Sequence, residues 1–190
     1  MFRLQIRYLS FFFGLISILS FFNIIYSYYL NLYLNLNTYY YSLFVSLIIS
    51  IVFYKFKIPV KKISIFDKIL TVFIGYLILP LILSIPFYFS IYNLTFLNSY
   101  FEAISGFTST GFSIFNNIKH IDQSLILWRS STQWIGGLYF LFSIILLIDI
   151  YDENFKKTLT NFISFDSSEI FKQALKIFLL YSTLTLIIFL

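Results

Sequence analysis

The chain has 190 residues, of which 59% are hydrophobic and only 11% are charged, and its formal net charge is +5. Soluble domains are usually about 45–50% apolar and about 25% charged, so this composition excludes an ordinary water-soluble domain and favours the lipid bilayer as solvent. The absence of cysteine excludes a disulfide framework, and a single histidine argues against the usual metal or catalytic clusters.

Apolar runs predict five membrane-spanning helices, since a span needs about 20 mostly apolar residues. In chain order they cover residues 9–30, 40–56, 69–91, 125–148 and 174–190. The first run lacks a small-residue cleavage site, so it is predicted to be a retained helix and not a signal peptide. Pro80 and Pro86 fall inside the third run and are expected to kink it.

Basic residues predict the orientation of the chain. With the N-terminus in the cytoplasm, every Lys and Arg except Lys119 and Arg129 falls on the cytoplasmic side, as the positive-inside rule requires. This predicts a multi-pass protein of the cell inner membrane. The basic residues on the cytoplasmic side of the lipid bilayer also explain the positive net charge. The expected partner is therefore the bilayer, and no nucleic-acid partner is expected. Residues 92–124 then approach the membrane from the outer face.

A repeat signal appears when the chain is shifted by 105 positions. It predicts that a unit of helix, external loop and helix begins near Phe66, and that a second copy begins near Phe171. The matching residues are Phe66, Leu70, Phe73, Tyr76, Leu79, Leu81 and Ile82 in the first copy, and Phe171, Leu175, Phe178, Tyr181, Leu184, Leu186 and Ile187 in the second.

The stretch "FEAISGFTSTGFSIF", residues 101–115, lies between long apolar segments but is too polar and too rich in Gly, Ser and Thr to be one of them. It predicts a short helix over about 98–107, capped by Asn98 or Ser99, with Glu102 in its first turn. Gly106 is expected to weaken the end of this helix. A filter segment over 108–112 follows.

Irregular backbone at membrane depth is tolerated only where protein buries it or where it lines a wet cavity. Such segments can aim main-chain carbonyl oxygens at an axis and replace the hydration shell of an alkali cation. Small residues before a glycine leave the carbonyls unobstructed, and glycine adopts positive φ. An ordinary external loop remains the alternative. The predicted ion-binding carbonyls are those of Thr108, Ser109, Thr110 and Gly111.

This stretch, followed by "LWRSSTQWIGGLYFL", resembles the first pore unit of the Trk/Ktr/HKT superfamily of potassium transporters, and the Trk-type pore-forming subunit in particular. The matching positions are Phe101, Glu102, Ala103, Ser105, Gly106, Thr108, Thr110 and Gly111, then Trp128, Arg129, Gln133, Trp134, Gly136 and Gly137. Ser109 stands where the family has a middle threonine, and Tyr139 where it tends to have another glycine.

The resemblance implies an all-α polytopic membrane protein. Two N-terminal helices and a basic loop occupy 1–65, one helix–pore loop–helix unit with a re-entrant filter occupies 66–150, and a cytoplasmic linker occupies 151–172. The first helix of a truncated second unit occupies 173–190. The family folds four units into one pore, so the resemblance covers under half of a complete member.

The resemblance also implies the function and the partners. These are K⁺ uptake through a filter of main-chain carbonyls, a homodimer, and a cytoplasmic nucleotide-binding regulatory subunit on the basic inner loops. K⁺ is favoured when every unit supplies a filter glycine, as Gly111 does here. No cofactor and no enzymatic step are expected. The alternatives are a non-conducting truncated fragment, a homotetramer that closes the pore, or a polytopic enzyme acting on lipids.

Several single residues carry narrower expectations. Arg129 is expected to snorkel at the outer end of its helix. Glu102 is expected to be a buried carboxylate that holds the short helix, and His120 to be solvated. Four residues of the fourth span are expected to serve packing, or packing and the membrane interface: Trp128, Trp134, Gly136 and Gly137.

Overall fold

The computed structural model describes residues 6–55, 65–117, 120–148 and 169–189, which form helices and turns and, within these ranges, no strand. The long helices are α1 (Ile6–Tyr29), α2 (Leu36–Lys55), α3 (Ile65–Leu83), α6 (Gln123–Ile148) and α8 (Glu169–Phe189). Two short helices lie between α3 and α6, namely α4 (Ile85–Tyr88) and α5 (Phe96–Phe107). The all-α prediction is confirmed.

Three helical segments among the described residues are long and apolar enough to cross a membrane: Tyr8–Tyr29, Leu36–Lys55 and Phe66–Tyr88. They coincide with the first three predicted spans, so the chain is a multi-pass membrane protein. Helices α6 and α8 form where the fourth and fifth spans were expected. That these two also cross the membrane stays a prediction.

The third segment contains a break that the prediction missed. Pro80 lies inside α3, whereas Pro86 lies in the first turn of α4, where a missing N–H is tolerated. The hydroxyl of Ser84 donates to the carbonyl of Leu81 at 2.7 Å between the two helices. The expectation that Pro86 kinks a continuous helix is therefore wrong, because Pro86 starts a new one.

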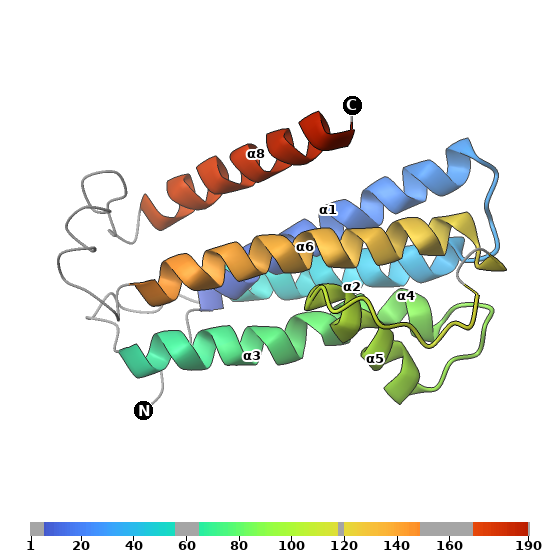
Figure 1. Ribbon diagram of the computed structural model, residues 1–190, viewed down its shortest axis with the longest axis horizontal. Helices are drawn as coiled ribbons and strands as arrows, with labels where there is room; N and C mark the ends of the chain where they lie inside the picture. The colour runs from blue at the N-terminus through green and yellow to red at the C-terminus, as the bar shows by residue number, and fades with distance from the viewer. Residues whose placement is uncertain (1–5, 56–64, 118–119, 149–168, 190) are drawn as a thin grey trace.

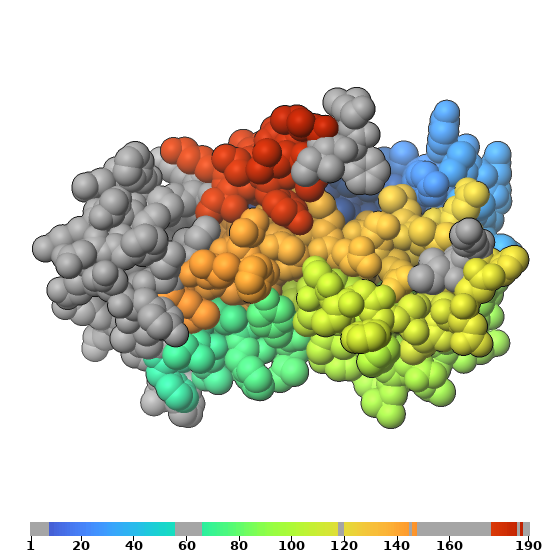
Figure 2. Space-filling view, in the orientation of Figure 1, coloured from blue at the N-terminus to red at the C-terminus, as the bar shows by residue number. Residues whose placement is uncertain are grey.

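The long helices run side by side along the length of the molecule (Figure 1). The start of α1, the end of α2, the start of α3, the end of α6 and the start of α8 all lie at one end of the bundle. Helices α4 and α5 lie toward the opposite end. Helix α8 covers part of α6 on the surface of the molecule (Figure 2), where Trp134 packs on Phe178 at a ring distance of 5.7 Å.

Serine side chains line the contact between α1 and α2. The hydroxyl of Ser10 donates to the carbonyl of Ser50 at 3.1 Å, and the hydroxyl of Ser50 donates to the carbonyl of Ser10 at 2.9 Å. The hydroxyl of Ser20 reaches that of Ser42 at 3.1 Å. Small residues let two membrane helices approach closely and hydrogen-bond across the interface, so this pair forms a compact base for the rest of the bundle.

Tyr139 lies at the centre of the buried core. Its ring is 4.8 Å from that of Phe12, 4.9 Å from that of Tyr76 and 5.3 Å from that of Phe107. Its hydroxyl donates to the carbonyl of Val72 at 3.0 Å and passes over Gly75, where any Cβ would overlap it. A glycine on α3 thus makes room for the tyrosine on α6, and α1, α3, α5 and α6 pack around one ring.

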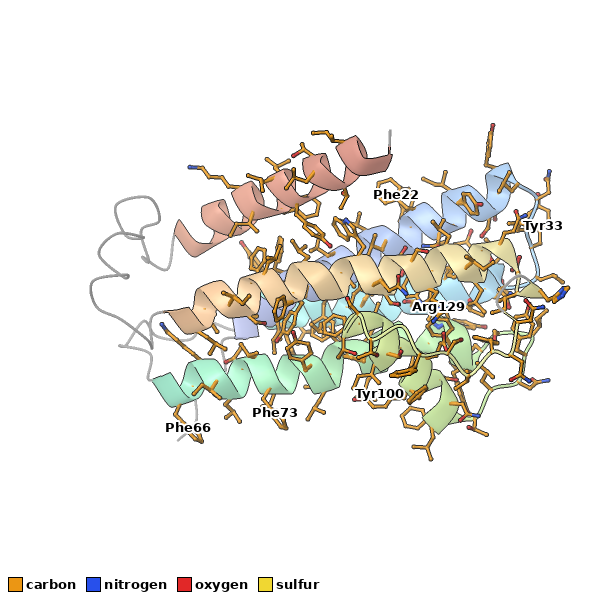
Figure 3. All side chains as sticks on the ribbon, viewed as in Figure 1. Phe22, Tyr33, Phe66, Phe73, Tyr100 and Arg129 are labelled. Carbon is orange, nitrogen blue, oxygen red and sulfur yellow. The ribbon has the colours of Figure 1, made fainter. Side chains whose placement is uncertain are left out.

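Large apolar side chains also cover the outer surface of the bundle. Phe22, Phe66 and Phe73 point away from the helices (Figure 3) and are 58%, 57% and 61% exposed. Arg129, in contrast, points inward from α6. This pattern, with apolar side chains outside and a charge inside, is the one expected for a bundle surrounded by lipid.

Two sets of predictions fall on residues outside the described ranges. These are the predictions about the basic loop around 56–64 and about the linker over 149–168. The orientation in the membrane, the docking of a regulatory subunit on these loops and the boundaries of the units therefore stay predictions. Helices form at both copies of the repeat, since Phe66 lies in α3 and Phe171 in α8.

Candidate functional site

Helix α5 begins earlier than the sequence predicted. Thr95 has extended backbone and is the N-cap, and its hydroxyl accepts a hydrogen bond from the N–H of Asn98 at 3.3 Å. The prediction of Asn98 or Ser99 as the cap is wrong. Ser99 lies inside the helix, and its hydroxyl donates to the carbonyl of Thr95 at 3.0 Å. Glu102 therefore lies in the second turn and not in the first.

The end of α5 is closed by a Schellman motif. The N–H of Ser109 donates to the carbonyl of Gly106 at 2.9 Å, and the N–H of Thr110 donates to that of Ser105 at 3.1 Å. This motif requires a left-handed residue after the helix, and Ser109 supplies it with φ +57°. Gly111 follows with φ +79°, which confirms the positive φ predicted for this glycine. The chain therefore reverses sharply over residues 108–111.

The reversal lies about midway along the bundle. A methyl group on Gly136 would overlap the backbone of Phe107, and one on Gly106 would overlap the hydroxyl of Thr132. Gly136 lies near the middle of the 26-residue α6. The ring of Phe107 also contacts that of Tyr76 on α3 at 5.6 Å. The segment thus descends beside α3 and α6 and does not lie across the end of the bundle.

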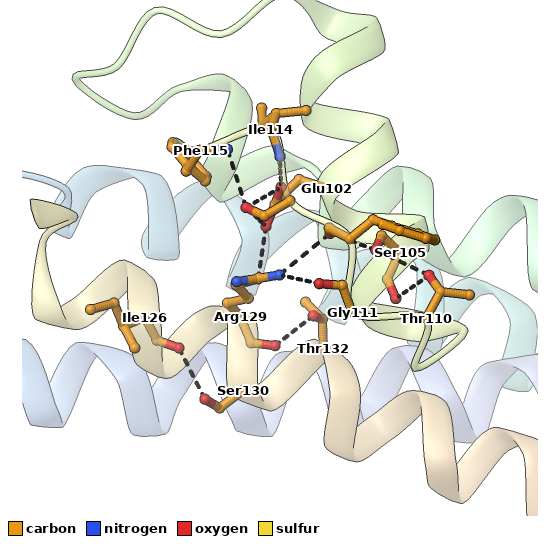
Figure 4. A network of polar contacts seen from close by, with 12 residues as sticks. Glu102, Ser105, Thr110, Gly111, Ile114, Phe115, Ile126, Arg129, Ser130 and Thr132 are labelled. Carbon is orange, nitrogen blue, oxygen red and sulfur yellow. Dashed lines mark hydrogen bonds and ion pairs between the residues drawn. The ribbon is translucent and has the colours of Figure 1, made fainter. Parts of the chain in front are cut away.

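A buried ion pair lies behind the reversal (Figure 4). Nε of Arg129 is 2.7 Å from Oε1 of Glu102, whose side chain is fully buried, while that of Arg129 is 9% exposed. The expectation that Arg129 snorkels is wrong, because the guanidinium points into the protein toward Glu102. The buried carboxylate expected at Glu102 is confirmed. A charge without a partner at such a site would be strongly destabilising, so each member requires the other.

Both charged side chains also bind the backbone that follows the reversal. Nη2 of Arg129 donates to the carbonyls of Gly111 at 3.2 Å and of Phe112 at 3.4 Å. Glu102 accepts a hydrogen bond from the N–H of Ile114 at 2.9 Å and from the hydroxyl of Ser113 at 3.1 Å. The pair therefore holds residues 111–114 from one side.

Hydroxyl groups of α5 and of the reversal itself also hold this segment in place. The hydroxyl of Ser105 donates to the carbonyl of Phe112 at 2.6 Å and lies 3.1 Å from that of Thr110. The hydroxyl of Thr108 donates to the carbonyl of Ile104 at 2.7 Å. These bonds join the last turn of α5 to both ends of the reversal, so its conformation is set by several independent contacts.

The predicted ion-binding residues, Thr108, Ser109, Thr110 and Gly111, lie together in this reversal and are exposed. No described residue donates a hydrogen bond to the carbonyl oxygens of Thr108, Ser109 or Thr110. The carbonyl of Gly111 accepts one from Arg129 and keeps a second lone pair. The described side chains also form no group of three His, Cys, Asp or Glu that could hold a metal ion.

Other expectations concerned the helix after the reversal. Gly136 serves packing, as predicted, and so does Gly137, whose added Cβ would lie 2.6 Å from the hydroxyl of Tyr181 on α8. Trp128 is fully buried, and its ring N–H donates to the carbonyl of Leu83 at 3.0 Å. His120 is exposed, as expected.

A second polar network, at the end of the bundle, was missed. The carboxylate of Asp122 accepts from the side-chain amide of Asn35 at 2.8 Å and from the hydroxyl of Ser124 at 2.6 Å. The hydroxyl of Tyr39 donates to that of Ser124 at 2.9 Å. These residues join the start of α2 to the start of α6, at the end of the bundle and away from the reversal. Only the position of Asp122 directly before an apolar run, which is typical of the residue that precedes a helix, could have drawn attention to it.

Three known proteins are similar to parts of this chain, although no family model matches it. An uncharacterized cation transporter of Methanocaldococcus jannaschii is 28% identical over 127 residues, which are 66% of this chain and 27% of that protein. The Trk system potassium uptake protein TrkI of Halomonas elongata is 38% identical over 60 residues, 32% of this chain and 11% of that protein. The protein TrkG of the same description, from Escherichia coli, is 37% identical over 46 residues, 24% of this chain and 10% of that protein. The chain thus spans about a quarter or less of the length of these relatives.

Proposed function

Because this chain is a distant homologue of Trk system potassium uptake proteins over part of its length, we propose that it forms part of a pore for K⁺ uptake across the inner membrane. In this proposal, α5 (Phe96–Phe107) is the pore helix and residues 108–112 are the filter. Dehydrated K⁺ passes the main-chain carbonyls of Thr108, Ser109, Thr110 and Gly111. No covalent bond changes, in keeping with relatives that are named as transporters.

The observation that carries the proposal is the reversal after α5. It presents three carbonyl oxygens without a hydrogen-bond donor among the described residues, about midway along a bundle of apolar helices. Free carbonyls in lipid would be costly, whereas carbonyls that line a wet cavity can replace the water around a cation. The carbonyl end of α5 also carries partial negative charge close to this path.

A complete ring of carbonyls needs more than one such segment. In the proposal, the segment supplies one quarter of the ring and further units supply the rest. The homodimer, the cytoplasmic nucleotide-binding subunit and the cytoplasmic N-terminus rest on the family resemblance and on the distribution of basic residues. Like the identity of the transported ion, these features are part of the proposal.

Replacement of Gly111 by serine tests the filter. At φ +79° a side chain is strained, although nothing lies within 4 Å of the added Cβ. Gly111→Ser in the intact transporter should therefore leave the fold in place, disturb the carbonyls and lower the ratio of Rb⁺ to Na⁺ uptake. The measurement is isotope uptake by cells that lack their own K⁺ uptake systems, normalised to the amount of transporter in the membrane.

Ser130→Ala is the control. Ser130 is exposed on α6, and its hydroxyl donates to the carbonyl of Ile126 on the same helix, so the uptake ratio should stay that of the original protein. An unchanged ratio in Gly111→Ser, at equal amounts of protein in the membrane, would contradict the filter assignment.

A further inference from the structure

The Glu102–Arg129 ion pair combines two properties that packing alone does not require. The pair is buried, with Nε of Arg129 at 2.7 Å from Oε1 of Glu102. It also contacts the backbone directly after the reversal, where Nη2 of Arg129 donates to the carbonyl of Gly111. A full positive charge thus lies directly behind an oxygen that is proposed to face the ion.

The two side chains bind different groups of residues 111–114. Arg129 donates to the carbonyls of Gly111 and Phe112, while Glu102 accepts from the N–H of Ile114 and the hydroxyl of Ser113. Arg129 therefore controls where the last filter carbonyl lies. The carboxylate of Glu102 only accepts hydrogen bonds, so it binds no filter carbonyl and affects the ion path through Arg129.

We propose that Arg129 is the positioning residue for the Gly111 carbonyl and that Glu102 cancels its charge, so that an entering cation meets an oriented carbonyl without net positive charge behind it. This inference rests on the proposed function of residues 108–111. It assigns orientation, and hence selectivity, to Arg129. It assigns cation affinity to the charge of Glu102.

The assignment predicts a different defect for each of the two single variants. Glu102→Gln keeps the shape but leaves the guanidinium uncompensated, and the KM for Rb⁺ should rise roughly tenfold, as expected for one charge within about 10 Å at an effective dielectric constant of about 20. Arg129→Gln removes the positive charge and replaces the guanidinium by a shorter amide. The amide cannot reproduce the bonds of Nη2 to the Gly111 and Phe112 carbonyls, so this variant should lower the Rb⁺/Na⁺ uptake ratio without raising the KM.

The double variant Glu102→Gln/Arg129→Gln separates electrostatics from packing. Its KM should return to near that of the original protein, because no net charge remains, while its Rb⁺/Na⁺ ratio should stay low. A pair with only a structural role would change the amount of folded protein in all three variants, without this reversal of the KM. A KM as high in the double variant as in Glu102→Gln would overturn the proposal.

The experiment uses the intact transporter in cells without their own K⁺ uptake, with the membrane amount measured in parallel. If Glu102→Gln does not reach the membrane, the double variant alone decides. A near-original KM with a lowered ratio supports the proposal, and an unchanged ratio overturns it. Ser130→Ala is the control, because the hydroxyl of the neighbouring Ser130 donates only to the carbonyl of Ile126 on its own helix.

Gly111→Ser serves as the reference that separates this inference from the proposed function. If Gly111→Ser lowers the Rb⁺/Na⁺ ratio while the Arg129 variants leave it unchanged, the filter stands and only the role of Arg129 fails. If neither Gly111→Ser nor any variant of the pair changes the ratio, the filter assignment itself fails.

Discussion

Gly111 and Gly136 show two different reasons for glycine at this site. Gly111 has φ +79° and open space around it, so its backbone conformation is what excludes other residues. Gly136 lies within a regular helix, and the backbone of Phe107 occupies the space that a Cβ would need. The first glycine shapes the reversal, and the second lets α5 approach α6.

Gly136→Ala should therefore destabilise the protein by about 1–3 kcal/mol, the usual cost of overpacking a well-packed contact. The backbone of Phe107 cannot rotate away as a side chain could, so α5 must move. The measurement is unfolding of the purified protein by SDS in mixed micelles.

Gly14→Ala is the matched control for this measurement. It adds the same methyl group within α1, where the nearest atom is the side-chain hydroxyl oxygen of Ser50 at 3.3 Å. It should change stability little. Equal destabilisation by the two alanines would show that close approach at Gly136 is not the cause.

Helix α5 owes its position to its two ends. Thr95 caps its start through the N–H of Asn98, and the left-handed Ser109 closes its end. Between the ends, Glu102 and Ser105 are buried on the side that faces α6 and residues 110–114. A helix of 12 residues is too short to be stable by itself, so these contacts define where it starts and how deep it reaches.

Thr95→Ala should cost about 1 kcal/mol of stability, as is typical for the loss of an N-cap hydroxyl. Asn98→Ala should have little effect, because Asn98 takes part in the cap through its backbone N–H and not through its side chain. SDS unfolding curves of the two variants distinguish them. A larger loss in Asn98→Ala would restore the cap predicted from the sequence.

At the scale of the whole molecule, the helices alternate in direction through the bundle. The ends that connect to the lysine-rich segments lie together, and the turn before α5 lies toward the other end (Figure 1). This arrangement is the one that the distribution of basic residues requires. It makes the orientation in the membrane testable with two positions, one at each end.

The chain has no cysteine, so single cysteines can report this orientation. Asn93 is exposed in the turn before α5, and Lys55 is exposed at the last residue of α2. Asn93→Cys should react with a membrane-impermeant maleimide in intact cells, whereas Lys55→Cys should react only after the membrane is permeabilised. The reverse pattern would place the N-terminus outside.

Features that depend on neighbours in the sequence could be predicted. Apolar runs long enough to span a bilayer placed the long helices, because the lipid solvent requires such runs whatever their partners. The small residues Thr108 to Thr110 and Gly111 marked the reversal, since a glycine after short polar residues favours positive φ. The end of α5 at Phe107 was also predicted, although the left-handed residue that closes the helix is Ser109 and not a glycine.

Features that depend on contacts between residues distant in the sequence could not be predicted. Arg129 pairs with Glu102 across two helices, Tyr139 fits above Gly75, and Pro86 begins a separate helix. Each outcome depends on how closely helices approach, and a local pattern carries no information about that distance. A buried charge must find its counter-charge wherever the packing provides it, so the environment of Arg129 emerged only once α5 and α6 were placed side by side.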